Sequence, residues 1–349
     1  MKKKNQKIKL AFFDTKAYDR EAFDAAQTEG IAITYFDTRL DKTTARLATG
    51  FDAVCLFVND SADREVIDIL YRGGVRLIAL RCAGFNQVDV EAAFGKIHVV
   101  RVPSYSPEAI AEHTAALLLT SVRRIHKAYN RTREYNFSLQ GLTGFNLYGK
   151  TVGVVGTGKI GRAFIRICQG FGMRVLAYDP YPAELPGVEN VTLDELFARA
   201  DILSLHCPLT EENRHLLNRE TLARCRRGVV VINTSRGGLI DAVALLDAIK
   251  KKQVGAACLD VYEEEADLFF HDKSGHILRD DILARLLSMP NVIVTSHQAF
   301  LTGEALGSIA ETTLDNIRAF FRDGRTENEI CYRCASLDGC RKERKEKCF

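Results

Sequence analysis

The chain has 349 residues, which is long for one hydrophobic core, so two domains are expected. Hydrophobic residues make up 46% and charged residues 27% of the chain, as in ordinary globular proteins, and no run approaches the about 20 apolar residues of a membrane span. A formal net charge of +3 is too small to indicate a nucleic-acid surface. The basic N-terminus looks like the start of a signal peptide, but Asp14 ends the following apolar run too early. We therefore expect a cytoplasmic protein whose partners are small molecules, with no nucleic acid and no membrane.

Short apolar segments alternate with amphipathic, helix-length stretches almost from end to end. The first expected strands are 9–14, 32–37, 53–58, 76–82 and 97–103, with helices such as 17–27 and 63–72 between them. A second series of expected strands comprises 151–156, 174–179, 201–207, 228–234, 255–262 and 291–297. Nearly continuous Val, Ile and Leu runs joined by helices indicate parallel strands covered on both faces. The predicted fold class is therefore α/β, with two doubly wound, Rossmann- or flavodoxin-like sheets.

A long helix, expected over 107–130 with Pro107 in its first turn, separates the two series. The second series with this helix is predicted to form a dinucleotide-binding domain of residues 105–298. A last expected helix, 302–323, could return the chain to the first sheet. The first domain would then comprise 1–104 and 299–330, with the other domain inserted in it.

The last residues, 331–349, form a basic tail that holds four of the ten cysteines: Cys331, Cys334, Cys340 and Cys348. Such a group could bind zinc or an iron–sulfur cluster. However, the intervals after the first C-x-x-C pair fit no common metal-binding pattern, which favours a thiol-bearing tail without a metal. The other six cysteines are scattered singly and are typical of small buried apolar residues.

Gly156, Gly158 and Gly161 form a G-x-G-x-x-G array between an expected strand and an expected helix, and the next strand ends in Asp179. In this context the glycines permit a tight turn and close approach of a pyrophosphate to the start of the helix. A carboxylate at Asp179 can bind ribose hydroxyls and would repel a 2′-phosphate. The motif therefore predicts NAD as the cofactor. The alternative is that Asp179 only caps the turn that follows it.

Three polar residues lie at or just beyond the ends of strands in the same domain: Arg236, Glu265 and His297. An imidazole can give a proton to a new alkoxide, a nearby carboxylate can orient it, and a guanidinium can bind a substrate carboxylate. Together they predict hydride transfer to a 2-oxo acid at the carboxyl edge of the sheet. Taken singly, each has an ordinary alternative: a hydrogen-bonded core histidine, a surface arginine, and one member of an acidic run.

At these residues the sequence resembles the D-isomer-specific 2-hydroxyacid dehydrogenases over about residues 8–325, through "GTGKIGR", "NTSRGGLID", "LDVYEEE" and "SHQAF". The match is closest to the lactate-forming members of that family. The resemblance implies that His297 is the general acid/base, Glu265 its partner and Arg236 the substrate-binding arginine. It also implies a substrate domain that closes on the cofactor across a hinge, and a homodimer or homotetramer formed through the dinucleotide domain.

The resemblance further implies sets of ligand contacts. The expected cofactor contacts are Gly156, Thr157, Gly158, Lys159, Ile160, Gly161, Asp179, His206, Cys207, Pro208, Asn213, Thr234, Ser235, Arg236 and Asp260. The expected substrate contacts are Cys82, Ala83, Gly84, Tyr105, Arg236, His297 and Phe300. Among these, N–H groups around Ala83 and Gly84 would form an anion nest. Tyr105 and Phe300 would line a small pocket, which favours pyruvate and D-lactate over 3-phosphoglycerate.

Three alternatives remain beside a reversible pyruvate reductase. A sibling enzyme would act on hydroxypyruvate, glyoxylate or a bulkier 2-oxo acid. Formate dehydrogenases resemble this fold but pair their histidine with glutamine, whereas Glu265 stands here. An NAD-sensing corepressor on the same fold keeps a similar triad, but this chain has only seven prolines and no long Pro-rich interaction segment.

Overall fold

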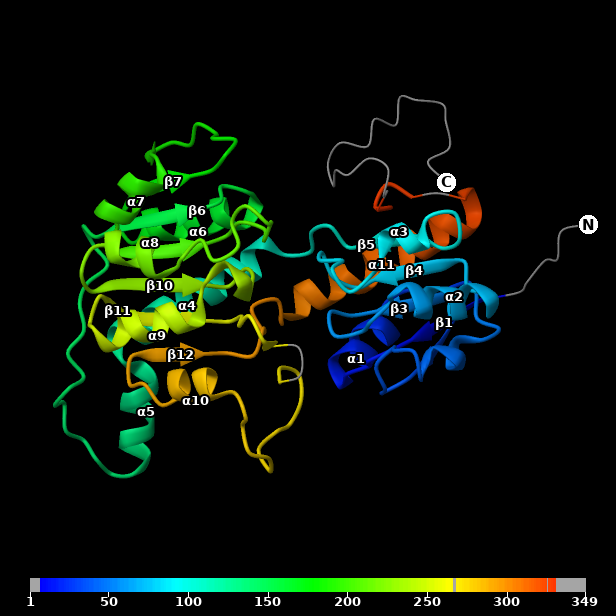
Figure 1. Cartoon of the computed structure of the whole chain (residues 1–349), viewed down its shortest axis with the longest axis horizontal. Coiled ribbons are helices and arrows are strands. Elements are labelled where there is room, and N and C mark those ends of the chain that lie inside the picture. The colour runs from blue at the N-terminus through cyan, green and yellow to red at the C-terminus, as the bar shows by residue number, and fades with distance from the viewer. Residues whose placement is uncertain (1–6, 266–267, 325, 331–349) are drawn as a thin grey trace, which may run out of the picture. The chain divides into compact units, whose positions relative to one another are not determined.

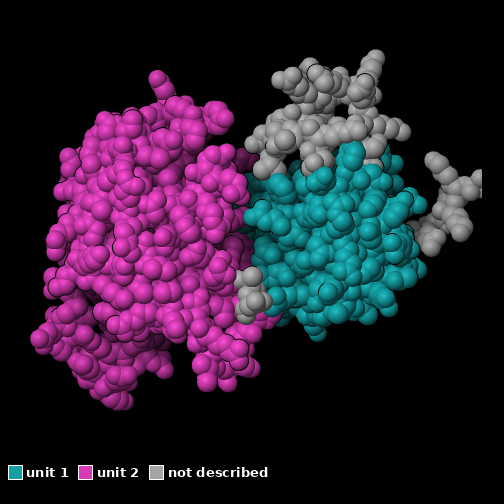
Figure 2. Space-filling view, viewed as in Figure 1, with its two compact units in different colours: residues 1–106, 302–349 teal, residues 107–301 magenta. Residues whose placement is uncertain are grey.

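The computed structural model describes residues 7–265, 268–324 and 326–330, which divide into two compact units (Figure 1). Figure 2 shows the division: one unit takes the described residues up to Ser106 and from Thr302 onward, and the other is Pro107–Leu301. The chain leaves the first unit once, builds the second and then returns. Over the described part of the chain, no helix combines the length and the apolar character needed to cross a membrane.

The first unit contains a five-stranded parallel sheet in the order β2-β1-β3-β4-β5. Its strands are β1 (Ile8–Phe12), β2 (Ile31–Tyr35), β3 (Ala53–Leu56), β4 (Leu77–Leu80) and β5 (His98–Arg101). Its helices are α1 (Ala17–Ala25), α2 (Arg64–Arg72), α3 (Val90–Ala93) and α11 (Gly303–Asp323), with a 3-10 turn η1 (Ala45–Ala48). Helix α11 packs against α1, β4 and β5, so the end of the chain completes the cover of this sheet.

The second unit contains a seven-stranded parallel sheet in the order β12-β11-β10-β9-β6-β7-β8 (Figure 1). Its strands are β6 (Thr151–Val155), β7 (Arg174–Tyr178), β8 (Val188–Asn190), β9 (Ile202–Leu205), β10 (Val229–Asn233), β11 (Val254–Leu259) and β12 (Val292–Val294). The strand order reverses between β6 and β9. In doubly wound sheets, ligands bind at the carboxyl ends of the strands near this point.

Helices cover both faces of the seven-stranded sheet. One core contains residues of α4 (Pro107–Arg123) and α6 (Lys159–Gly170). The opposite core contains residues of α7 (Leu193–Arg199), α8 (Arg219–Arg224), α9 (Ala242–Lys250) and α10 (Asp281–Leu287). Successive residues of β10 alternate between them, since Val231 belongs to the second core and Ile232 to the first. A strand buried on both faces needs the continuous apolar sequence seen here.

The predicted fold class is confirmed, but the structure differs from the predicted elements in two places. The helix expected over 107–130 is divided at Arg124, whose φ of 55° is left-handed, into α4 and α5 (Ile125–Arg133). At this break a later segment packs on the end of α4, where a Cβ on Gly144 would lie 1.9 Å from the carbonyl oxygen of Val122. Strand β8 was not predicted, because its sequence VEN is short and polar at the edge of the sheet. The expected cysteine-rich tail lies outside the described residues.

Candidate active site

The predicted site residues of the second unit follow the carboxyl ends of six adjacent strands. In sheet order, His297 follows β12, Glu265 follows β11, Arg236 follows β10, His206 and Cys207 follow β9, Gly156 follows β6, and Asp179 follows β7. Because these strands are parallel, their carboxyl ends meet at one edge of the sheet. Folding therefore gathers on one edge residues that are far apart in the sequence.

His297 and Glu265 form a hydrogen-bonded pair. Nδ1 of His297 lies 2.7 Å from Oε1 of Glu265, and Oε2 of the same carboxylate accepts the backbone N–H of Tyr262 at 2.9 Å. Since an ionised carboxylate only accepts, Nδ1 carries the proton and Nε2 is the ring nitrogen available to a substrate. The exposed fractions of the two side chains, 19% and 22%, mean that a ligand can reach the pair, unlike a fully buried core histidine.

The backbone of His297 is left-handed, with φ 54°, and Asp260 holds it there. The carbonyl oxygen of Asp260 accepts the N–H of His297 at 2.7 Å. Its carboxylate accepts the N–H groups of Gln298 and Ala299, each at 2.9 Å. Non-glycine residues rarely adopt this conformation, so a dense set of contacts is needed to maintain it.

Asp260, an expected cofactor contact, lies fully buried (0% exposed) beneath this loop. Its Oδ1 also accepts the hydroxyl of Thr295 at 2.6 Å and lies 3.4 Å from Nε2 of His113. Burial alone would favour the neutral carboxyl, but the bonds from His113, Thr295 and the two backbone N–H groups outweigh it and lower the pKa of Asp260. His113 and Thr295 were not predicted from the sequence, since nothing in the local pattern marks them.

Arg236 lies just beyond the end of β10 and is the N-cap of the 3-10 turn η2 (Gly237–Leu239). Its Nη1 donates to the carbonyl oxygen of Ser235 at 2.7 Å, and its own carbonyl accepts the Asn233 amide at 2.8 Å. The next residue is Gly237, where a Cβ would lie 2.1 Å from the carbonyl carbon of Tyr262. Only glycine fits this approach, which packs the Arg236 turn against the turn that leads to Glu265.

The glycine array fits a dinucleotide pyrophosphate. A Cβ on Gly161 would lie 2.0 Å from the carbonyl oxygen of Gly156, and Gly156 has a positive φ of 96°. By contrast, a Cβ on Gly158 would meet nothing within 4 Å. Gly158 is also the N-cap of α6, and no side chain in the described structure caps this helix start. Open space beside free N–H groups at a helix N-terminus is the arrangement that binds phosphate.

Asp179 lies at the end of β7 and faces the glycine loop. One carboxylate oxygen accepts the N–H and the hydroxyl of Thr157, at 2.7 and 3.0 Å. The other accepts the N–H of Tyr181 at 2.9 Å, so Asp179 also caps the turn that follows it. Partial burial opposes ionisation, but these hydrogen bonds outweigh it and lower the pKa of Asp179. The group therefore presents a negative charge in the neutral pH range.

His206 and Cys207, after β9, are uncharged. Burial lowers the pKa of His206 to about 3 and raises that of Cys207 to about 11. Nε2 of His206 lies 2.8 Å from Oγ of Ser204, and its ring lies against Phe164, with 5.1 Å between ring centroids.

Hydrogen bonds also join the other expected cofactor residues of this edge. The Ser235 hydroxyl donates to the carbonyl oxygen of Cys207 at 2.5 Å, and Thr234 pairs with Thr114 at 2.9 Å. The amide of Asn213 donates to the carbonyl oxygen of Pro208 at 2.7 Å. Lys159 and Ile160 begin α6.

The residues of the expected anion nest lie in the first unit, in the turn after β4. Sγ of Cys82 donates to the carbonyl oxygen of Gly84 at 3.2 Å, and Arg101 donates to that of Ala83 at 2.9 Å. The N–H groups of Ala83 and Gly84 donate to no acceptor among the described residues. Tyr105 is partly exposed between β5 and α4, whereas Phe300, in the second unit, is 7% exposed.

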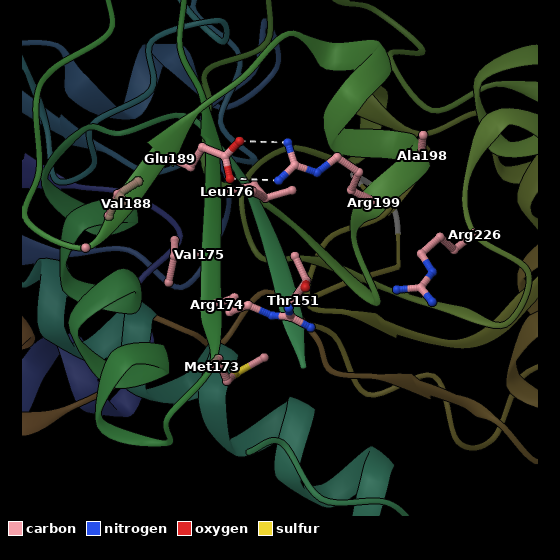
Figure 3. Close-up of a pocket in the computed structure, with 11 residues that line it drawn as sticks. Thr151, Met173, Arg174, Val175, Leu176, Val188, Glu189, Ala198, Arg199 and Arg226 are labelled. Carbon is pink, nitrogen blue, oxygen red and sulfur yellow. Dashed lines mark hydrogen bonds and ion pairs between the residues drawn. The ribbon is translucent and has the colours of Figure 1, made fainter. Parts of the chain in front are cut away.

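A separate cleft of about 820 Å³ lies at the amino ends of β6 and β7, near Thr151 and Arg174. Glu189 and Arg199, two of the residues that line it, form an ion pair at 2.7 Å, and Arg226 also lines the cleft (Figure 3). Among the described residues that line this cleft, none belongs to the predicted site. It lies at the sheet edge opposite the glycine array.

Comparison with known proteins places these features in a family. Residues 115–299 match the model of the D-isomer specific 2-hydroxyacid dehydrogenase NAD-binding domain, which confirms the predicted cofactor. A 2-hydroxyacid dehydrogenase homolog of Haemophilus influenzae is 54% identical over 316 residues, covering 89% of this chain and 95% of the relative. D-lactate dehydrogenase of Escherichia coli is 51% identical, covering 93% of this chain and all (100%) of the relative. The apo structure of the Escherichia coli enzyme has a TM-score of 0.85 and 50% identity, covering 92% and 99% of the two chains.

Proposed function

Because the chain belongs to the D-isomer-specific 2-hydroxyacid dehydrogenases, we propose that it is an NAD-dependent D-lactate dehydrogenase that reversibly reduces pyruvate. The observation that carries the proposal is the accessible His297–Glu265 pair on the same sheet edge as the glycine array. A relative named for this activity, which is 51% identical to this chain, supports lactate as the product.

We assign NAD binding to residues 105–298 and substrate binding to 1–104 with 299–330. Because the reaction draws on NADH, we infer a cytoplasmic location.

The pair performs the proton transfer. NADH, when bound, supplies the hydride for the carbonyl carbon of pyruvate. Glu265 fixes Nδ1–H of His297, so Nε2 gives its proton to the forming alkoxide. In lactate oxidation the same nitrogen takes the proton from the hydroxyl. The adjacent carboxylate stabilises the imidazolium, which is the proton donor in pyruvate reduction and is formed again when lactate is oxidised.

The remaining assigned residues bind and select the substrate. The guanidinium of Arg236 is the candidate partner of the substrate carboxylate, because its planar fork matches a carboxylate. In the first unit, the N–H groups of Ala83 and Gly84 are candidate anion-binding groups. We assign the restriction to a small side chain to Tyr105 and Phe300.

We also propose that a second copy of the chain covers an apolar surface on the second unit. The surface, here called the arm, comprises residues 125–148, and α5 has no buried residue along its described length. Its exposed large apolar residues are Ile125, Tyr129, Tyr135, Phe137, Leu139, Phe145 and Tyr148, with exposed fractions from 38% to 85%. Monomeric proteins rarely expose such an extended apolar surface, which supports a homo-oligomer.

The test of the activity is NADH oxidation with pyruvate, compared with hydroxypyruvate, glyoxylate and isobutyl- and phenyl-bearing 2-oxo acids. We expect the highest kcat/KM for pyruvate, with D-lactate on chiral analysis of the product. Preference for another acid would replace the lactate assignment but keep the mechanism. NADH binding without turnover of any acid would instead support an NAD-sensing protein.

A further inference from the structure

We propose that His113, on α4, is a positioning residue that fixes the loop of the catalytic histidine through Asp260 and Thr295. The inference rests on the proposed function, in which His297 exchanges the substrate proton. His113 lies just before residues 115–299, which match the family's NAD-binding domain. It touches His297 only through the residues between them.

The protons at this junction can be assigned from the distances. Nε2 of His113 lies 3.2 Å from Oγ1 of Thr295 and 3.4 Å from Oδ1 of Asp260. Thr295 has one hydroxyl proton, which it donates to Oδ1 of Asp260 at 2.6 Å. Ionised Asp260 can only accept. Nε2 of His113 therefore carries a hydrogen and donates toward both oxygens, which fixes the tautomer of this histidine.

Asp260 connects His113 to the backbone of residues 295–299. The carbonyl of the preceding residue, Leu259, accepts the N–H of Thr295 at 2.9 Å. The carbonyl of Asp260 holds the N–H of His297 at 2.7 Å, and its carboxylate holds the next two N–H groups. The left-handed backbone of His297 is strained and persists only where surrounding contacts determine it. Asp260 supplies those contacts.

His113 matters because the Asp260 carboxylate is fully buried. A buried carboxylate needs charged or polar donors to remain ionised. Without the His113 donor, the anion would attract water or take up a proton, and either change weakens its hold on the N–H groups of Gln298 and Ala299. The direction of Nε2 of His297 would then be less well fixed, and small errors in such geometry slow a reaction strongly.

The experiment compares His113→Leu, which removes the donor, with His113→Gln, whose side-chain amide can still donate. The control is His276→Leu, at an exposed histidine outside the site. For His113→Leu we expect kcat to fall roughly 10- to 100-fold. The Kd for NADH should change less than about threefold, because the glycine array follows β6, whereas Asp260 and Thr295 follow β11 and β12. His113→Gln should recover most of kcat, and His276→Leu should match the wild type.

Hydrogen–deuterium exchange gives a readout that does not depend on turnover. The amides of residues 297–299 should exchange faster in His113→Leu than in His113→Gln or the wild type. Thr295→Val should act in the same direction, and adding it to His113→Leu should have less than an additive effect. If His113→Leu folds poorly, Thr295→Val alone carries the test.

Wild-type kcat and unchanged exchange in His113→Leu would overturn the proposal. So would equal losses in the Leu and Gln variants, or a loss confined to NADH binding. If the wild type prefers another 2-oxo acid, the comparison is made with that acid, and only the lactate assignment fails. If no acid is turned over, the exchange measurement still decides the positioning role.

Discussion

The carboxylate of Glu265 uses one oxygen to hold His297, at 2.7 Å, and the other to hold the backbone N–H of Tyr262, at 2.9 Å. Its orientation is therefore fixed by its own turn before it orients the imidazole. The neighbouring Gly237 packs directly on Tyr262, so the turn that carries Arg236 shares the same support. The three candidate catalytic residues thus depend on one small junction between β10 and β11.

We expect His297→Gln to lower kcat for pyruvate roughly 10²- to 10⁴-fold, because glutamine cannot transfer the proton. Glu265→Gln should lower kcat roughly 10- to 100-fold. The oxygen of the glutamine amide can accept a hydrogen bond from either Nδ1 of His297 or the N–H of Tyr262, and its NH₂ group then faces the other donor. Both variants should keep the NADH affinity of the wild type. Stopped-flow reduction and NADH fluorescence titration would test this, and a fully active His297→Gln enzyme would overturn the mechanism.

Two glycine substitutions separate packing from cofactor binding. Gly161→Ala would place a Cβ 2.0 Å from the carbonyl of Gly156, so we expect a Tm lower by several degrees and loss of NADH binding. Gly158→Ala meets nothing within 4 Å, and its φ of −64° suits alanine. It should fold normally but bind NADH at least about tenfold more weakly, because the pyrophosphate needs that space. Thermal melting and NADH titration measure both effects. Normal NADH affinity in Gly158→Ala would place the pyrophosphate elsewhere.

The fold was largely predictable because most strands of both sheets are buried on both faces and therefore have continuous apolar sequences. Strand β8 escaped prediction because it lies at an edge, where the sequence need not be apolar. The end of α4 was not predicted because a later segment packs on it there, with Gly144 against the backbone of Val122. Local periodicity cannot record such a contact.

The site residues that could be predicted are those whose place in the sequence also fixes their place in the fold. Arg236, Glu265 and His297 follow strand ends, so the parallel topology alone brings them to one edge. His113 lies on a helix, and its partners Asp260 and Thr295 come from a different part of the sequence. Its role depends on how α4 packs against the sheet, and no motif marks it.

Asp179 should determine the preference for NADH over NADPH. Asp179→Asn keeps an acceptor for Thr157 but removes the charge that repels a 2′-phosphate. We expect the NADPH/NADH ratio of kcat/KM to rise at least about tenfold, a difference of about 1.4 kcal/mol. Because hydrogen bonds lower the pKa of Asp179, this carboxylate stays charged between about pH 8 and pH 6 and adds no pH dependence of its own to the ratio there. An unchanged ratio in the variant would assign the selectivity to another residue.

His206 should make the stability of the apo protein sensitive to acid. Burial lowers its pKa in the folded state to about 3, below the usual 6.5, so the unfolded chain binds the proton more tightly. The contribution of neutral His206 to the free energy of unfolding is complete above about pH 6.5 and is lost as the pH falls toward 3. Between about pH 6.5 and 5 the loss is at most about 2 kcal/mol, since one pKa unit corresponds to about 1.4 kcal/mol.

Urea unfolding at about pH 7.5 and pH 5 would measure this loss. His206→Gln should lose less free energy of unfolding on acidification than the wild type does. The same change at the exposed His276 should leave the wild-type pH dependence intact. Equal pH dependence in all three proteins would mean that His206 is not held neutral by burial.

The arm should hold two copies of the chain together. Tyr135 and Leu139 are 85% and 79% exposed, so an aspartate at either position costs the isolated chain little, whereas an apolar interface would have to bury its charge. We expect Tyr135→Asp and Leu139→Asp to shift a dimer or tetramer toward smaller species in light scattering coupled to size-exclusion chromatography. Tyr181→Asp is the matched control, because Tyr181 is 87% exposed but lies after β7, outside the arm. A wild type that elutes as a monomer at all concentrations, or arm variants that keep the wild-type mass, would show that a second copy does not cover this surface.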